Sequence, residues 1–136
     1  MEELLGLVRG LPNFAQHAVA ATVSALAFLW IYSRITPWHE MKLIREGNAA
    51  AAVSFGGAFI GFCMPVANVM AHSTNVLDFL LWALVALIVQ VVVHVSVRLL
   101  IGDLIKHIEE GVMASAVFAA ALSLGFGLLN AACLTY

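Results

Sequence analysis

A stripe of polar residues inside one apolar segment is the first feature of the sequence that could support chemistry. Gln90, His94 and Arg98 are spaced four residues apart, so on a helix they share one face. Polar side chains within a membrane helix face protein or water, and they can mark an ion or proton path. Asn68 and Asn130, near the ends of two other apolar segments, complete this candidate set. The alternative, which we favour, is that Arg98 reaches the headgroups while the other polar residues form hydrogen bonds between helices.

Charged residues between two apolar segments could instead bind a metal ion. Asp103, His107 and Glu110 follow the spacing i, i+4, i+7, which can present three ligands to a divalent cation. Loop residues of these types beside lipid headgroups are more often simply hydrated, so we expect no metal and no cofactor. The sequence also contains no nucleophile beside a recognisable base, no phosphate-binding loop and no haem motif. We therefore do not expect an enzyme.

Small residues at four-residue spacing form the third candidate set. Gly57 and Gly61 make a GxxxG pattern, and Ala121 and Gly125 lie 64 residues further on. Such spacing lets helix backbones approach closely in a membrane. It predicts close packing at these four positions, either within the chain or between chains. We expect Gly61→Leu or Gly125→Leu to disrupt folding or assembly, and Gly127→Ala to be tolerated better.

The composition indicates which elements must position these residues. Hydrophobic residues make up 63% of the 136-residue chain, charged residues 10%, and the mean hydropathy is +1.02, whereas soluble domains carry about 25% charged residues. Four apolar segments, each long enough to cross a bilayer as a helix, occupy roughly residues 14–33, 49–70, 79–101 and 112–135. These features predict one all-α integral membrane domain over residues 1–136, with four transmembrane helices.

Part of the chain is repeated at a fixed offset of 64 residues. Residues 34–64 match residues 98–128 without gaps at ten positions. The matched pairs are Arg34/Arg98, Lys42/Lys106, Ile44/Ile108, Glu46/Glu110, Gly47/Gly111, Ala50/Ala114, Ala52/Ala116, Val53/Val117, Gly61/Gly125 and Phe62/Phe126. Internal repetition indicates a duplicated structural unit. It predicts two copies of a two-helix unit, at about residues 14–70 and 78–135, and these copies run in parallel because each contains an even number of spans.

Basic residues are distributed unequally among the connecting segments. Five of the six, Arg34, Lys42, Arg45, Arg98 and Lys106, lie in residues 34–48 and 98–111, which link the first to the second and the third to the fourth apolar segment and, in the second case, include the end of the third segment. The positive-inside rule then places both of these loops in the cytoplasm and both termini outside. The loops could contact anionic lipid or a cytoplasmic protein partner. The net charge of −2, with the basic residues divided between loops, argues against a nucleic-acid partner.

Each basic loop is expected to contain a short helix at the membrane interface. Residues 35–47 and 99–111 place apolar residues at near-helical spacing among charges, a pattern typical of helices that lie among the headgroups. The apolar residues expected in the headgroup layer are Trp38, Met41, Ile44, Leu104, Ile105 and Ile108. The charged residues of the same segments are expected to face water.

An arginine and a glutamate recur together in the two copies. Arg34 precedes Glu46 by the same distance that separates Arg98 from Glu110. We expect each arginine to form a bidentate ion pair with the glutamate of its own copy, because the planar guanidinium matches a carboxylate. Such a pair would tie the short helix to the spanning helix. The alternative is that both arginines only anchor the chain to phosphate groups.

Three motifs in the sequence resemble a known family. They are PheLeuTrpIleTyrSerArgIleThrPro at residues 28–37, LeuIleArgGluGlyAsnAlaAlaAla at residues 43–51 and AsnAlaAlaCysLeuThrTyr at residues 130–136. Over nearly its whole length the chain resembles the YjfL family of bacterial inner-membrane proteins, catalogued as domain of unknown function 350. The resemblance implies a four-span protein made of two two-helix units, in an envelope-associated context and without an established activity.

We therefore expect a multi-pass protein of the bacterial inner (plasma) membrane that works as a homo-oligomer among membrane lipids. The leading hypothesis is a structural or interaction component of the envelope. The alternative is a small transporter or channel subunit for an ion or small cation, because duplicated bundles often enclose a site near the membrane midplane. A carboxylate near the midplane would favour transport, but every acidic residue falls outside the four apolar segments.

Overall fold

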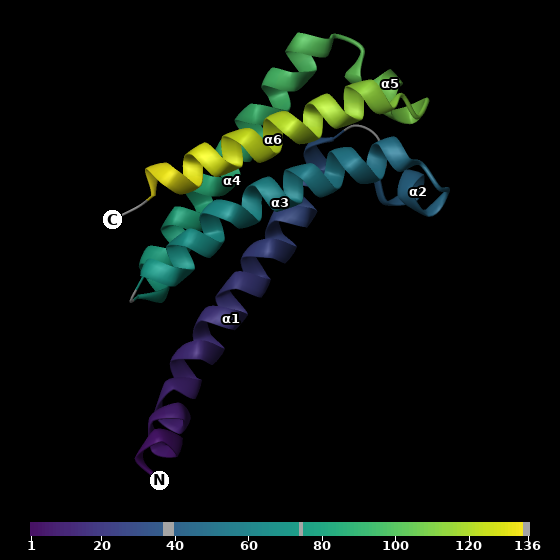
Figure 1. The fold of residues 1–136 in the computed structure, drawn as a ribbon. Helices are drawn as coiled ribbons and strands as arrows, with labels where there is room; N and C mark the ends of the chain where they lie inside the picture. The colour runs from purple at the N-terminus through teal and green to yellow at the C-terminus, as the bar shows by residue number, and fades with distance from the viewer. Residues whose placement is uncertain (37–39, 74, 135–136) are drawn as a thin grey trace.

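The computed structural model describes residues 1–36, 40–73 and 75–134, which form six helices (Figure 1). The helices are α1 (Glu2–Ile35), α2 (Glu40–Arg45), α3 (Ala49–His72), α4 (Val76–Ile101), α5 (Leu104–Glu109) and α6 (Met113–Cys133). Four of them, α1, α3, α4 and α6, are long and apolar enough to cross a membrane. The prediction of an all-helical chain with four such helices is confirmed, although α1 begins at Glu2 rather than near Phe14.

The turns follow from residues that disfavour helical backbone. Thr36, which precedes Pro37 in the sequence, is extended (φ −75°, ψ 124°) and ends α1. Gly102 ends α4 with a φ of +66°. Gly47 and Gly111 have φ values of +88° and +77°, a region that glycine enters without steric cost. Each of these two glycines reverses the chain from a six-residue helix into the next long helix.

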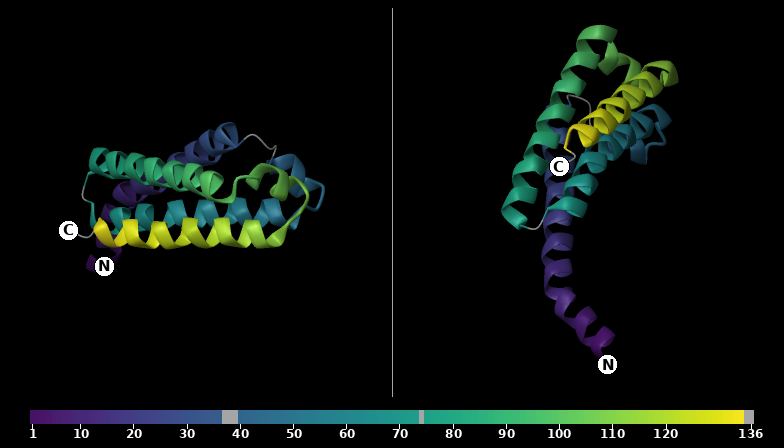
Figure 2. Two further views of the ribbon diagram at one scale, coloured as in Figure 1. Left: turned by 90° about the horizontal axis from the view of Figure 1, so that it is seen from above. Right: turned by 60° about the vertical axis from the view of Figure 1, so that its left-hand side comes forward.

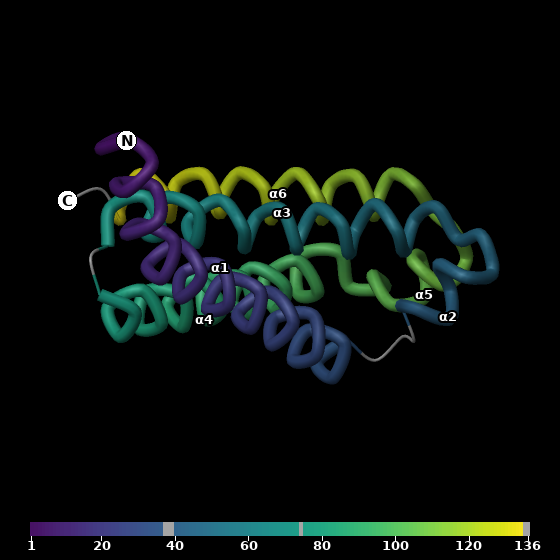
Figure 3. Tube along the Cα trace, turned by 90° about the horizontal axis from the view of Figure 1, so that it is seen from below, coloured from purple at the N-terminus to yellow at the C-terminus, as the bar shows by residue number. Residues whose placement is uncertain are grey.

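Helices α3 and α6 lie side by side, run in the same direction and form the most extensive helix contact of the bundle (Figures 2 and 3). At the end that carries α2 and α5, called here the loop end, the Asn48 side-chain amide donates to the carbonyl of Ile108 at 2.8 Å. At the opposite end, called here the far end, the Asn68 amide donates to the carbonyl of Ala131 at 2.6 Å. The two helices are therefore aligned in register from end to end.

The other two long helices pack differently on this central pair. Helix α4 contacts both α3 and α6, whereas α1 contacts α3 and α4. The buried residues of α1 all lie from His17 onward, and the part before His17 projects past the far end of the bundle (Figure 1). Half of α1 is thus part of the bundle and half is not.

Two buried apolar clusters fill the bundle at different levels. An aromatic cluster contains Phe28, Phe62 and Phe79, which are at most 2% exposed, together with alanine and valine side chains of α3 and α4. A second cluster, nearer the loop end, contains Val97, Leu104 and several alanines of α3 and α6. The alanines allow the helices to approach closely, while the rings fill the wider space between α1, α3 and α4.

The short helices α2 and α5 occur where the sequence places them, but their apolar residues do not all face outward. Leu104 and Ile108 are 1% and 0% exposed and belong to the buried cluster at the loop end. The expectation that they lie among lipid headgroups is therefore wrong, because α5 packs on α3, α4 and α6. Met41 of α2 is 50% exposed and Ile44 is half-buried, while Trp38 lies outside the described residues.

Candidate functional site

The buried polar residues of α4 make their contacts with two different helices. Gln90 is 1% exposed and His94 is 4% exposed, while Arg98 is half-buried at the end of the same face. The hydroxyl of Tyr32 on α1 and Nδ1 of His94 form a hydrogen bond of 3.2 Å, and their rings meet edge to face with centroids 5.1 Å apart. The direction of this bond depends on the histidine tautomer.

Gln90 joins α4 to the central helix pair. Its side-chain nitrogen Nε2 donates to the backbone carbonyl of Ser123 on α6 at 3.1 Å. The same nitrogen also lies close to Gly61 on α3, where an added Cβ would come within 2.8 Å of it. Three helices therefore meet around one amide, whose nitrogen is hydrogen-bonded while its oxygen Oε1 is buried without a hydrogen-bond partner among the described residues.

A carboxylate lies buried beside the Tyr32–His94 contact. Glu40, the first residue of α2, is 2% exposed and lies near Tyr32. Buried carboxylates are costly and mark candidate functional positions in membrane proteins. Sequence reasoning placed Glu40 in a water-facing loop and missed it, because the packing of α2 against the bundle is not visible in local spacing.

From this polar group toward the far end the core is mainly apolar, although His17 and Ser24 of α1 are also buried there. Phe28 and Phe62 stack with centroids 4.5 Å apart and an interplanar angle of 9°. Phe79 and Ala86, both 0% exposed, continue the same cluster toward the far end. Among the residues that the structure describes, the polar side chains of α4 therefore do not continue into a path through the bundle. Their observed contacts are those of hydrogen bonds between helices.

The two asparagines of the candidate polar set lie apart from Gln90 and His94. Asn68 bonds to the carbonyl of Ala131 near the far end, and Asn130 is half-buried on α6. The nitrogen Nδ2 of Asn130 is buried without a hydrogen-bond partner in the described part of the chain. The sequence grouped these residues by type, but in the structure the asparagines lie near the far end, whereas Gln90 and His94 lie nearer the loop end.

The backbones of α3 and α6 are in close contact at small residues. An added Cβ on Gly57 would lie 2.5 Å from the Cβ of Ala120, and one on Gly61 would collide with the carbonyl oxygen of Ser123. An added Cβ on Gly127 would in turn collide with the backbone of Gly61. This contact surface of Gly57, Gly61, Ala120, Ser123 and Gly127 is called here the α3–α6 seam.

The residues expected on the α6 side of the seam are not the ones that form it. Ala121 and Gly125 are exposed, and a Cβ on Gly125 would meet nothing within 4 Å. Of the two alternatives, close contact within the chain is therefore not found at Ala121 and Gly125, and contact between chains stays a prediction. The reason for expecting Gly127→Ala to be tolerated better, that Gly127 lies off the contact face, is wrong, because Gly127 lies against the backbone of Gly61. Gly57 faces Ala120 at an offset of 63 residues rather than 64, and one residue turns a helix face by about 100°.

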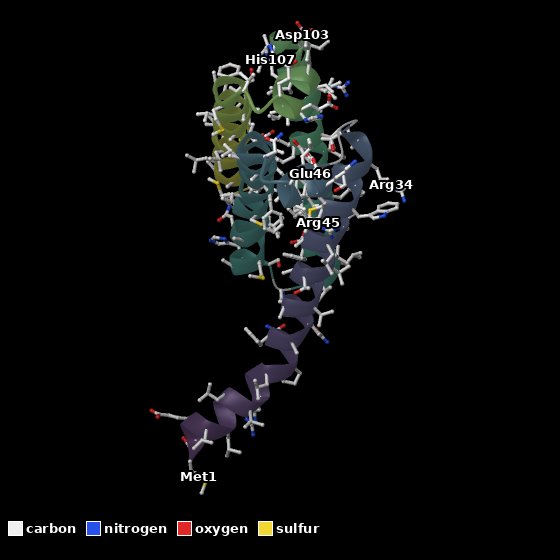
Figure 4. All side chains as sticks on the ribbon, turned by 90° about the vertical axis from the view of Figure 1, so that its right-hand side faces the viewer. Met1, Arg34, Arg45, Glu46, Asp103 and His107 are labelled. Carbon is white, nitrogen blue, oxygen red and sulfur yellow. The ribbon has the colours of Figure 1, made fainter. Side chains whose placement is uncertain are left out.

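The expected pairing of arginine with glutamate does not occur. Among the residues described, no ion pair joins Arg34 to Glu46 or Arg98 to Glu110. The guanidinium of Arg34 instead lies 5.0 Å from the ring centroid of Trp30, and it points away from the bundle and from Glu46 (Figure 4). Trp30 precedes Arg34 by one helical turn, so the local cation–π contact forms without any rearrangement of the loop.

The charged residues around α5 do not gather into a metal site. No group of three or more His, Cys, Asp or Glu side chains converges within the described ranges. His107 and Asp103 lie together at the loop end (Figure 4), but Nδ1 of His107 is 2.8 Å from the hydroxyl of Ser115 on α6. This contact fixes α5 on α6, and the metal hypothesis gains no support from it.

Comparison with known proteins identifies the family to which this four-helix chain belongs. The profile of the Domain of Unknown Function DUF350 matches residues 6–134. The UPF0719 inner membrane protein YjfL of Escherichia coli (strain K12) is 32% identical over 123 residues, which are 90% of this chain and 93% of that protein. The chain belongs to the DUF350 family. YjfL of Escherichia coli O157:H7 matches with the same identity and coverage, and no solved structure matches the chain.

Membership of DUF350 confirms the resemblance read from the motifs, and together with the four apolar helices it supports a multi-pass inner-membrane protein. Two residues that form hydrogen bonds between helices in this DUF350 chain, Tyr32 and Asn48, were not singled out from the sequence. Tyr32 gave no signal, because a tyrosine in an apolar helix is unremarkable. Asn48 did give one, since an asparagine before a run of alanines is a helix N-cap pattern, and its side chain accepts from the N–H of Ala51 at 3.0 Å.

Proposed function

We propose that this DUF350 protein is a homo-oligomeric structural or interaction component of the bacterial inner membrane, without catalytic activity of its own. A second copy of the chain packs on the open face of α6, defined by Ala121 and Gly125. The observation that carries the proposal is the contrast between Gly125, which has open space where its Cβ would be, and Gly61 at the equivalent position of α3, which is in backbone contact.

The chemistry of the open face supports a helix rather than lipid as its occupant. Small residues at four-residue spacing bring helix backbones together in a membrane, whereas lipid chains gain little from contact with a glycine. Phe118 and Phe126 border the open face at 46% and 48% exposure and can pack around a partner helix. Helix α6 already uses its other side for α3 and α4, so the open face is free for a second copy.

The basic residues of the loop end give the proposed assembly a second contact surface. Lys42, Arg45 and Lys106 are exposed at that end, and the positive-inside rule places it in the cytoplasm, with both termini outside. There the basic side chains can attract anionic lipid or an acidic protein partner. The near-constant offset of 64 residues between the starts of α2 and α5, and between those of α3 and α6, supports the further proposal that the two halves arose by duplication.

Disulfide trapping in native membranes tests the oligomer. In a background in which Cys63 and Cys133 are replaced by alanine, Gly125→Cys or Ala121→Cys should give a cross-linked dimer on oxidation, because equivalent faces of two copies meet. Val23→Cys is the matched control, since Val23 is 55% exposed on α1 and belongs to a different face. Absence of dimer at both α6 positions, or equal yield at position 23, would reject the second copy on this face.

A second candidate function rests on a different observation. The buried Glu40 beside the Tyr32–His94 contact supports a small transporter or channel subunit for an ion or small cation, because buried ionisable groups recur in proton and ion pathways. The Phe28–Phe62 stack would have to open to complete a route. Purified protein in liposomes should then carry an ion or polyamine flux that Glu40→Gln abolishes. Flux equal to that of protein-free liposomes would remove this candidate.

A further inference from the structure

Residues 1–14, all of which except Met1 belong to α1, have a pattern that the rest of the helix lacks. Residues 1–16 are all exposed, and they include six large apolar side chains, Leu4, Leu5, Leu7, Val8, Leu11 and Phe14, at 49–72% exposure. The polar residues and glycines of this segment are Glu2, Glu3, Gly6, Arg9, Gly10 and Asn13. At about 100° per residue the first set covers one side of the helix and the second set covers the other.

The length of α1 exceeds what a membrane crossing requires. Its 34 residues correspond to about 51 Å, against a hydrocarbon thickness of about 30 Å. A crossing of about 20 residues that ends at Arg34 begins near Ala15. The whole helix would fit within the hydrocarbon only at a tilt on the order of 50°, which is outside the usual range of about 0–40°. Such a placement would also bury Glu2, Glu3 and Arg9 in lipid.

A bend is built into α1 near the C-terminal end of this segment. Pro12 lies inside α1 and has no N–H to donate to the carbonyl of Val8, which weakens the helix at that turn. Gly10 is two residues away and lowers the local preference for helix further. The axis of α1 bends within this N-terminal part, and the end that carries Met1 turns away from the bundle (Figures 2 and 4).

We propose that residues 1–14 form an amphipathic helix that lies on the lipid surface, in the leaflet opposite to the loop end. The segment is joined directly to a spanning helix, so its C-terminal end is held at the level of the headgroups. A two-sided pattern fits the boundary between water and lipid, with Leu4, Leu7 and Leu11 directed into the acyl region. With Glu2 and Glu3 against Arg9 the segment is not basic, so its attachment depends on apolar burial rather than on anionic lipid.

Spin labelling of the full-length protein tests this placement. Single cysteines are introduced at each of residues 3–14 in the background lacking Cys63 and Cys133, labelled, and reconstituted in uncharged phosphatidylcholine vesicles. The accessibility of each label to oxygen, which concentrates in lipid, is compared with that to a water-soluble nickel reagent. We expect oxygen access to dominate at positions 4, 7 and 11 and nickel access at 3, 6 and 13, with no steady change of depth along the segment.

Three other results would each overturn the proposal. High nickel access at every position would place the segment in water, and a steady change of depth from residue 3 to residue 14 would place it across the bilayer. Low access of both reagents at positions 4, 7 and 11 would place it against another protein chain. In the triple variant Leu4→Gln, Leu7→Gln, Leu11→Gln, labels can still be placed at the other positions of the segment. None of these labels should then be more accessible to oxygen than to nickel. The triple variant should still fold, because these residues are exposed and belong to neither buried cluster of the bundle.

Discussion

The two halves of the chain share an order of elements but differ in how each half is used. Each has a long helix, a six-residue helix that a glycine with positive φ follows, and a second long helix. In the first half, α3 contacts α1, α4 and α6, whereas its counterpart α6 contacts α3 and α4 and leaves its face at Ala121 and Gly125 exposed. Helix α4 lies on both α3 and α6, but its counterpart α1 contacts α3 and α4 and extends past the far end of the bundle (Figure 1). Similar sequence therefore leads to different burial, because position in the bundle decides which face is covered.

Replacement of the equivalent glycines Gly61 and Gly125 by leucine should give the largest difference in stability between the two halves. Gly61→Leu forces a side chain into the backbone of Ser123 and Gly127, so we expect a loss of about 3 kcal/mol in stability or no folded protein. Gly125→Leu should leave the fold of the single chain intact and reduce its dimer. Unfolding in mixed detergent micelles measures the first effect, and chain mass in mild detergent measures the second. Equal instability of both variants would contradict the contrast.

A smaller contrast is expected within α6 itself. Gly127→Ala places a methyl group against the backbone of Gly61 and should cost about 1–2 kcal/mol, while Gly125→Ala should be near neutral or favourable because it replaces a helical glycine in open space. The two variants differ by one methyl group at positions two residues apart. If the same unfolding measurement ranks them in the reverse order, the assignment of the seam to Gly127 fails.

The polar contact that links the halves should have a moderate effect. Tyr32→Phe removes the hydroxyl bonded to His94 and should cost about 1 kcal/mol or less, as for other hydrogen bonds between membrane helices. Tyr32→Phe and His94→Leu should be non-additive in a double-mutant cycle. Ser96→Ala is the control, since the hydroxyl of Ser96 donates to the carbonyl of Val92 on its own helix. Additive losses for Tyr32 and His94 would remove this link between α1 and α4.

The N-terminal caps of α3 and α6 differ, so a cap can be removed from one helix and added to the other. Asn48 caps α3 and also bonds to Ile108, whereas the equivalent Val112 gives α6 no side-chain cap. Asn48→Ala should lower the stability by about 1 kcal/mol, and Val112→Asn should raise it by a few tenths of that amount. Helix stability at each site can be followed by hydrogen exchange of the first-turn amides. Unchanged protection in Asn48→Ala would show that the cap does not stabilise α3.

The smallest effect is expected at the arginines. Arg34 lies over Trp30 and has no ion pair with Glu46 in the described structure, so Arg34→Lys should change stability by less than about 1 kcal/mol. Arg34→Lys combined with Glu46→Gln should be additive, since the two groups do not interact. A coupling as large as that of a bidentate pair would restore the pairing that the sequence predicted.

How far the sequence predicts this molecule depends on whether a feature is local. The spanning helices and their turns follow from apolar length and from Gly47 and Gly111, which act on their own neighbours. The contacts of Gln90 and Tyr32 depend on which helices become neighbours, and no spacing in the sequence encodes that. The assignment of the seam to Gly125 instead of Gly127 failed for a similar reason. An alignment of repeats identifies equivalent residues, but a displacement by one residue changes the face that a helix presents.

Distances between chains give the most direct test of the central claim, that a second copy packs on the α6 face of Ala121 and Gly125. With one spin label per chain in liposomes, every dipolar distance is between chains. The account predicts a short, narrow distance for a label at Gly125→Cys and a longer one for a label at Val23→Cys on α1. No defined distance at position 125, or a shorter distance at position 23, would contradict it.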